Sequence, residues 1–184
     1  YDAMGNRISK TLLTTNNEQR TTIYVRDAKG NLIARYEQEN SSAINLKQFS
    51  LYGGSQLGTL ETEIDQSATA SNDSTFTRTL STKSYELKDH LGNIRAVVSD
   101  IKNSSLNASN THANFSADIT MATDYYSYGM QMPGRSYQSS NYKYGFQGKE
   151  KDDDIKGEGS SYDFGARLYD PRVGRWLSTD PLSD

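Results

Sequence analysis

One short motif, repeated three times, constrains the fold of this chain more than any other feature of its sequence. The motif is Asp-x-x-Gly-Asn, and it occupies residues 2–6, 27–31 and 89–93. Asp accepts hydrogen bonds from backbone N–H groups further along a turn, while Gly and Asn tolerate a positive φ. Apolar and polar residues alternate on both sides, as in strands with one buried face. The motif therefore predicts a strand, a tight turn and a second strand.

The repeats lead to a general expectation of hairpins. Residues 1–60 and 85–98 are predicted to form antiparallel hairpins, and the stretch 48–61 fits one more around Gly53 and Gly54. No window of about 12 residues has a convincing 3.6-residue period, so no long helix is expected. The repeated turns are predicted at Gly5-Asn6, Gly30-Asn31 and Gly92-Asn93. The expected fold class is all-β, with antiparallel hairpin repeats that form an open or spiral, cocoon-like sheet.

Two tracts rich in Ser, Thr and Asn interrupt the predicted hairpin repeats, at residues 66–83 and 102–117. Both have weak periodicity, and we interpret them as loop excursions or ragged edge strands on the array. Only 34% of the residues are hydrophobic, so the core is expected to be thin. Trp176 is the single Trp and needs apolar cover. We therefore expect Trp176 and Tyr169 to be buried, with Arg172 and Arg175 nearer solvent.

Composition excludes several classes of function. The net charge is −3 with Lys and Arg scattered, so the basic stripe of a nucleic-acid-binding protein is missing. The sequence contains no run of about 18 apolar residues and no recognisable export leader, so neither a membrane span nor a signal peptide is expected. The absence of Cys excludes disulfides, Cys-ligated zinc and thiol catalysis. His90 and His112 lack a third ligand at metal spacing, so we expect no metal and no cofactor.

Other motifs favour no enzyme class. Ser161 and Ser178 have no His at a spacing that suggests a serine triad. The stretch 157–161, Gly-Glu-Gly-Ser-Ser, lacks the strand-to-helix context of a phosphate-binding loop. The many Tyr residues suit strand packing better than a carbohydrate-binding surface.

The Tyr-led Asp-x-x-Gly-Asn units resemble YD repeats. The segment from "GFQGKEKDDD" to "YDFGARLYDPRVGRWLSTDPL" resembles the RHS-repeat-associated core, in the form of the sequence that is typical of Bacteroidota members. The resemblance is loose over residues 1–120 and close over 124–182. It implies two domains, YD-repeat-like hairpins with Ser/Thr/Asn-rich loops at 1–120 and the core at 121–184.

What the resemblance implies about function is a β-strand shell, wound as a cocoon, that encloses a variable C-terminal domain, often a toxin. The core caps one end of the shell. The implied partners are the chain's own C-terminal cargo domain and the upstream shell repeats, and the implied location is secreted or at the bacterial cell surface.

In the resembling family the core is also an aspartyl autoprotease that cuts the chain just after itself. Its catalytic positions correspond here to Asp180, Arg167 and Asp152. Two nearby carboxylates can share one proton, so that one activates water while the other polarises the carbonyl, and an Arg can stabilise developing charge. The alternative is structural: Asp152 belongs to a solvated charge run, and Asp180, like Asp170, is a turn residue before Pro.

The end of the motif departs from the family pattern. Many members continue Asp-Pro-Ile-Gly-Leu and are cut after the Leu, whereas this chain reads Asp-Pro-Leu-Ser-Asp, with Asp184 in place of that Leu. Three functions therefore stay open. The first is a cargo-enclosing shell with self-cleavage near Asp184. The others are a non-catalytic surface adhesion or scaffold module, and an exported cargo of a bacterial secretion system bound to its machinery.

Overall fold

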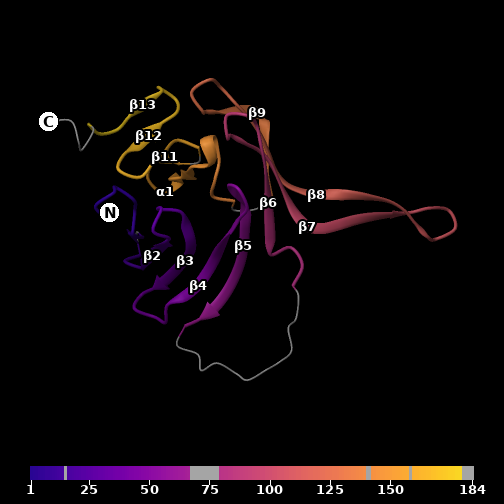
Figure 1. The fold of residues 1–184 in the computed structure, drawn as a ribbon, viewed down its shortest axis with the longest axis horizontal. Helices are drawn as coiled ribbons and strands as arrows, with labels where there is room; N and C mark the ends of the chain where they lie inside the picture. The colour runs from indigo at the N-terminus through magenta and orange to yellow at the C-terminus, as the bar shows by residue number, and fades with distance from the viewer. Residues whose placement is uncertain (15, 67–78, 140–141, 158, 180–184) are drawn as a thin grey trace. The chain divides into compact units, whose positions relative to one another are not determined.

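The computed structural model describes residues 1–14, 16–66, 79–139, 142–157 and 159–179 (Figure 1). The contacts divide the chain into two units, residues 1–83 and 84–184. Both units consist almost entirely of antiparallel strands that pair with their neighbours in the sequence. The all-β fold class with open antiparallel sheets is therefore confirmed.

The first unit is a run of strands joined by short turns. Each strand pairs antiparallel with the one before it, and cross-strand neighbours such as Tyr24 and Arg35 share a face. Register shifts interrupt the pairing at Val25/Arg26 and Arg35/Tyr36. The strands are β1 (Ser9–Leu13), β2 (Gln19–Arg26), β3 (Leu32–Glu39), β4 (Asn45–Tyr52) and β5 (Gln56–Asp65).

The second unit contains a large and a small group of strands. The large group is β6 (Lys83–Lys88), which begins at the boundary, β7 (Ile94–Leu106), β8 (His112–Tyr125) and β9 (Gln131–Gln138). The small sheet has the order β10 (Glu150–Lys151), β11 (Tyr162–Asp163), β12 (Leu168–Asp170) and β13 (Arg175–Trp176). Two short helical turns, η1 (Phe146–Gly148) and α1 (Asp153–Lys156), lie before and within this small sheet. In Figure 1 the far halves of β7 and β8 project from their group as a long two-stranded arm.

The predicted turns are confirmed, and their geometry is uniform. In the turn at 27–31 the first N–H donates to the fifth carbonyl at 2.9 Å, and the fourth N–H donates to the first carbonyl at 3.0 Å. The Asp27 Oδ1 atom also accepts the N–H groups of Lys29 and Asn31, both at 2.8 Å. Gly30, in fourth place, has a φ of 86°, which residues with a side chain rarely adopt. The same side-chain and backbone bonds close the turns at 2–6 and 89–93.

The same pair of backbone hydrogen bonds also closes turns that the motif did not predict. Each of these turns has a residue with positive φ in fourth place, which is Asn17, Asn110, Gly129 or Gly148. They lie at residues 14–18, 107–111, 126–130 and 145–149. The five-residue turn is therefore the common connection of this chain, and Asp is one of several residues that can begin it.

The turn at 107–111 corrects the expectation for residues 102–117. Instead of a loop or a ragged edge, β7 and β8 continue through this tract as an antiparallel pair, with register shifts at Val98/Lys102 and Ser105/Leu106. Asn107 takes the role of Asp, since its Oδ1 accepts the N–H groups of Ser109 and Thr111, both at 3.0 Å. Of the other tract, residues 67–78 lie outside the described part of the chain.

The cores are thin, as expected, and both contain buried polar groups. In the first unit the buried apolar side chains are Tyr24, Leu32, Ala34 and Leu46, beside Arg7, Thr22, Arg35, Gln48 and Thr59. In the second unit they are Ile94, Val97, Met121, Tyr125, Tyr142, Tyr144 and Tyr162. Most of the second core therefore lies where β7 and β8 meet the segment after β9. Among the described residues, no helix is long and apolar enough to cross a membrane.

Candidate functional site

Asp152 lies between β10 and α1 and is only 1% exposed. Its backbone N–H donates to the Ser161 carbonyl at 2.9 Å, and the Ser161 hydroxyl donates to the Asp152 carbonyl at 2.7 Å. These bonds extend the β10–β11 pairing by one residue. Asp153 accepts the Gly159 N–H at 2.7 Å, and Asp154 is exposed. The alternative that Asp152 belongs to a solvated charge run is therefore wrong for Asp152 itself.

Arg167 lies in the turn between β11 and β12. Its guanidinium carbon is 4.3 Å from the centroid of the Trp176 ring, so the cation stacks on the indole face. Its backbone carbonyl accepts the Phe164 N–H at 3.1 Å, which closes the turn. The Arg167 side chain therefore packs against Trp176 of β13.

The structure places two of the three predicted catalytic residues in one small sheet. The Asp152 backbone is hydrogen-bonded to Ser161, which precedes β11. The Arg167 backbone is hydrogen-bonded to Phe164, which follows β11. At about 3.3 Å per residue, these attachment points lie roughly 10 Å apart along the strand. Asp180 lies outside the described residues. Asp152 and Arg167 thus belong to opposite ends of β11, and the geometry of the complete set stays a prediction.

Asp170 has the turn role that the sequence favoured for it. Its Oδ1 accepts the Arg172 backbone N–H at 3.1 Å and the Arg172 Nε–H at 3.0 Å, and its Oδ2 accepts from Nη2 at 2.6 Å. The side-chain hydrogen bond with Asp170 raises the pKa of the Arg172 guanidinium. The Asp170 carbonyl accepts the Gly174 N–H at 2.9 Å, and Pro171 is fully buried. Asp-Pro here closes the β12–β13 hairpin.

The prediction that Trp176 is buried is wrong, because its side chain is 40% exposed. Trp176 lies on β13, the last strand in the order of the small sheet, so one side of it faces the sheet edge. Its cover consists of Arg167 on one ring face and the rings of Phe164 and Tyr169, with centroids 5.1 and 5.2 Å away. Tyr169 is half-buried, while Arg172 and Arg175 are exposed as expected.

The aromatic core of the second unit gathers around Phe146 in η1. The Phe146 ring lies 5.9 Å from Tyr125, 6.1 Å from Tyr162 and 6.3 Å from Tyr169, measured between centroids. Burial raises the pKa of Tyr125 and of Tyr162, so both hydroxyls remain hydrogen-bond donors well into the alkaline range. A Cβ added to Gly129 would lie 2.4 Å from Phe146 Cγ, so this position admits no side chain without rearrangement.

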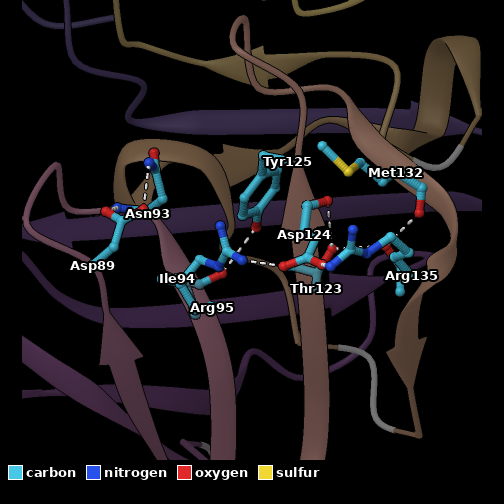
Figure 2. Close-up of polar contacts among 10 residues, drawn as sticks. Asp89, Asn93, Ile94, Arg95, Thr123, Asp124, Tyr125, Met132 and Arg135 are labelled. Atoms are coloured by element: carbon cyan, nitrogen blue, oxygen red, sulfur yellow. Dashed lines mark hydrogen bonds and ion pairs between the residues drawn. The ribbon is translucent and has the colours of Figure 1, made fainter.

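Sequence reasoning missed the contact that joins the third repeated turn to this aromatic core. Asn93 Oδ1 accepts the backbone N–H of Gln147 at 3.0 Å, and the Ile94 N–H donates to the Gly145 carbonyl at 3.2 Å. The Tyr125 hydroxyl donates to the Ile94 carbonyl at 3.1 Å (Figure 2). We call Asn93, Ile94 and Tyr125 the docking site of the 145–149 turn. The sequence signal that could have indicated this contact is Gly145, because it occupies the first position of its turn, where three other turns have Asp.

The Asp89 carboxylate orients this docking site. Asn93 donates its Nδ2–H to Asp89 Oδ2 at 2.9 Å, which directs the amide oxygen of Asn93 toward Gln147. Burial raises the pKa of Asp89, but the hydrogen bonds from Asn93 and Leu91 together lower it below its usual value. The carboxylate is therefore ionised, and a pure acceptor, at neutral pH.

An ion-pair network beside the docking site ties three strands together. Asp124 on β8 pairs with Arg95 on β7 and, at 2.6 Å, with Arg135 on β9. Figure 2 shows both guanidinium groups directed at this one carboxylate. All three side chains are partly exposed, so solvent screens the pairs and their net contribution to stability is modest.

A cavity of about 490 Å³ is lined by residues of β8 and β9 together with Gly159, Ser160 and Arg172. Its lining combines thioether, amide and hydroxyl groups, including Met121, Met132, Gln138 and Ser160. Ser160 precedes Ser161, which is hydrogen-bonded to Asp152. Among the described residues, His, Asp and Glu form no group of three that could hold a metal ion. The cavity therefore lies against β8 and β9, and the Arg172 side chain adds a cation to its lining.

Comparisons with known proteins place the chain by its fold. No family model matches it. It is 29% identical over 193 residues to Salivary gland surface protein 1 of Aedes aegypti, an alignment that covers 99% of this chain and 4% of that protein. The crystal structure of TcdB2-TccC3 without hypervariable C-terminal region is similar over 98% of this chain and 7% of that chain, with 18% identity and a TM-score of 0.59.

A second crystal structure, of TcdB2-TccC3, matches over 95% of this chain and 9% of that chain, with 18% identity and a TM-score of 0.41. The chain therefore spans a small fraction of the proteins it matches. At this level of identity the likeness concerns architecture: the fold of the chain is similar to that of one segment of TcdB2-TccC3 without hypervariable C-terminal region.

Proposed function

We propose that this chain is part of an RHS-type β shell that encloses or presents a variable C-terminal cargo. The observation that carries the proposal is the similarity in fold over 98% of the chain to TcdB2-TccC3 without hypervariable C-terminal region. That structure was determined without a hypervariable C-terminal region, and a region of this kind would suit a variable cargo. The hairpin-by-hairpin course of the strands supports the same architecture.

In this proposal residues 1–120 supply YD-repeat hairpins and residues 121–184 supply the core. The partners are upstream shell repeats and the cargo that follows the core. The amino-acid sequence of the core motif supports a bacterial protein of Bacteroidota type that is secreted or held at the cell surface.

The test uses the full-length protein that contains this chain. Limited proteolysis should spare the segment that follows residue 184 under native conditions and degrade it once urea opens the sheet. The same segment expressed alone should be degraded at once. Equal rates of degradation with and without the sheet would rule out enclosure.

A non-catalytic surface module is the second candidate. It is supported by the relative from Aedes aegypti, which is named a surface protein. This candidate predicts a stable sheet that binds other surfaces without protecting any downstream segment, so the proteolysis experiment separates the two.

We further propose that the core cuts its own chain near Asp184, with Asp180 and Asp152 as the carboxylate pair and Arg167 as the charge-stabilising group. One carboxylate removes a proton from the attacking water while the other, protonated carboxyl donates its proton to the peptide carbonyl oxygen. The first carboxyl then passes the proton taken from water to the amine nitrogen as the C–N bond breaks, and the second recovers its proton as the C=O bond re-forms. The burial of Asp152 within the β10–β11 pairing supports a site protected from bulk solvent.

Electrophoresis of precursor variants tests this step. Asp180→Asn should leave the precursor full length, because an amide cannot exchange protons as a carboxylate does. Arg167→Ala should slow the cut. Asp170→Asn is the matched control, since Asp170 closes a turn by accepting bonds from Arg172. If the Asp180→Asn precursor is processed at the wild-type rate, the proposed autoproteolysis is wrong. The proposed role as part of a shell is not affected by that result.

A further inference from the structure

The turn between β12 and β13 contains one of the two Asp-Pro bonds of the chain, Asp170–Pro171. An Asp-Pro bond is labile because the Asp carboxylate can attack its own carbonyl carbon as a nucleophile. The Pro nitrogen carries no hydrogen and leaves as a secondary amine. The other such bond begins at Asp180 and lies outside the described residues. The groups around Asp170 therefore show whether this chemistry is available in the folded hairpin.

The carbonyl group of the Asp170–Pro171 bond is already polarised. Its oxygen accepts the Gly174 N–H at 2.9 Å. A donor at this distance stabilises the negative charge that develops on a carbonyl oxygen when a nucleophile attacks the carbon. Gly174 has a φ of 66°, a conformation that favours glycine, so the donor is fixed by the turn itself. The bond that closes the hairpin thus also supplies an oxyanion donor.

The nucleophile of this reaction is present but is held by Arg172. Asp170 Oδ1 accepts the Arg172 backbone N–H at 3.1 Å and Nε–H at 3.0 Å, while Oδ2 accepts from Nη2 at 2.6 Å. Charge-assisted bonds of this kind are short and strong. The side-chain hydrogen bond with Asp170 also raises the pKa of Arg172, so the guanidinium remains charged. Attack by the carboxylate therefore requires that the ion pair first be broken.

Arg172 also lies between the carboxylate and solvent. Asp170 is only 4% exposed and Pro171 is fully buried. The Arg172 side chain is 44% exposed, and it lines the cavity of about 490 Å³ beside β8 and β9. Its guanidinium thus contacts the buried carboxylate on one side and solvent on the other. A shorter, neutral side chain would release the carboxylate and admit water to the turn.

We propose that Asp170–Pro171 is a latent self-cleavage site that Arg172 keeps closed. When the guanidinium is removed, a carboxylate oxygen of Asp170 forms a bond to the Asp170 carbonyl carbon. The C–N bond to Pro171 breaks, the nitrogen takes a proton from solvent, and a cyclic anhydride remains on Asp170. One water molecule then opens the anhydride to two carboxyl groups. The sum is hydrolysis of the peptide bond, with no change of oxidation state.

This site is distinct from the proposed cut near Asp184. Its nucleophile and its scissile carbonyl belong to the same residue, so it needs neither a second carboxylate nor Arg167. The inference therefore depends neither on cargo enclosure nor on the autoproteolysis proposed above. A cut after Asp170 would separate β13, which carries Trp176, from β12. The ion pair of Asp170 with Arg172 thus protects the covalent continuity of the small sheet.

The experiment uses the whole 184-residue chain in mildly acidic buffer, with fragments separated by chromatography and identified by mass. Because Trp176 is the single Trp, a cut after Asp170 moves all indole fluorescence to the peptide 171–184, whereas a cut after Asp180 leaves it on the larger fragment. Folded wild-type protein should release little of this peptide. Arg172→Gln should release it about tenfold faster, the effect of losing one charge-assisted hydrogen bond.

Arg135→Gln is the matched control, because Arg135 also pairs with an Asp at 2.6 Å and its loss changes the charge equally. This control should release the peptide at the wild-type rate. Asp170→Asn combined with Arg172→Gln should stop the release, since an amide is a much weaker nucleophile than a carboxylate. In urea, Arg172→Gln and wild type should be cut at equal rates, because the unfolded chain lacks the ion pair.

Trp176 fluorescence shows whether Arg172→Gln keeps the hairpin folded. If the hairpin unfolds, Arg172→Lys takes its place, because Lys keeps the charge without the paired donors and should give a smaller increase. The proposal is overturned if the folded variant releases the peptide no faster than wild type. It is also overturned if the double variant with Asp170→Asn releases the peptide equally fast, or if the acceleration persists in urea.

Discussion

The turns at 27–31 and 89–93 are closed by the same hydrogen bonds, yet their surroundings differ. Asn31 is exposed, whereas Asn93 is buried against a turn more than 50 residues later in the chain. The Asp and the backbone are arranged alike in both. The motif therefore determines the turn, while the neighbouring element determines whether the turn is a surface feature or an anchor.

The largest contrast is expected from added methyl groups. Gly129→Ala should lower the free energy of unfolding by about 3 kcal/mol or more, because the new Cβ meets the Phe146 ring and the backbone has a positive φ. Gly92→Ala has a similar φ of +84° but open space around the Cβ, so about 1–2 kcal/mol is expected. Urea denaturation measures both, and equal midpoints would contradict close packing around the docked turn.

Removal of the two Asn amides should give the next largest difference. Asn93→Ala leaves the Gln147 N–H without its acceptor and should cost about 2–3 kcal/mol. Asn31→Ala loses only the exposed bond to Asp27 and should cost about 0.5–1 kcal/mol. Trp176 fluorescence during urea unfolding reports on the small sheet. A midpoint for Asn93→Ala no lower than that for Asn31→Ala would mean that the docking contact does not anchor this part.

The two Tyr hydroxyls allow a finer comparison. Tyr125→Phe removes the donor to the buried Ile94 carbonyl and should cost about 1–2 kcal/mol. Tyr52→Phe removes the equivalent bond to Leu32 at a more exposed position, where water can replace it, so about 0.5 kcal/mol is expected. Thermal unfolding of both variants would show whether the ranking holds.

The smallest expected effects are on the loss of folding stability at low pH. The side-chain hydrogen bond from Asn31 lowers the pKa of Asp27, and in Asp89 the hydrogen bonds outweigh the opposing effect of burial. A lowered pKa in the folded state gives stability that is present above the unfolded pKa, about 3.9, and is lost as pH falls through the folded pKa. Stability measured from pH 6 to pH 2 should therefore decline less steeply in Asp89→Asn than in wild type. Identical profiles would show that this carboxylate is not responsible.

Sequence predicts this chain well where the chemistry is local. The turns at 27–31 and 89–93 follow from Asp accepting nearby N–H groups and from Gly in fourth place, so their positions needed no tertiary information. The turn at 107–111 was missed because Asn107 and Asn110 replace Asp and Gly, and Asn-rich sequence also suits loops.

Sequence predicts much less where distant elements meet. Trp176 was expected to be buried from its chemistry alone, but its exposure depends on its place at the edge of the small sheet. The burial of Asp152 depends on pairing with Ser161 across α1, and the role of Asn93 depends on Gln147. Asp180 lies outside the described residues, so its predicted role remains to be tested by the precursor variants.

The contact between Asn93 and Gln147 also predicts an order of folding. The β6–β7 hairpin closes over a few residues, whereas the docked turn must bring together atoms 54 residues apart. Short loops close at a lower entropic cost than long ones, so the 89–93 turn forms first and offers a finished acceptor to the later one. We therefore expect the small sheet to dock on a hairpin whose acceptor, the Asn93 amide oxygen, is already in place.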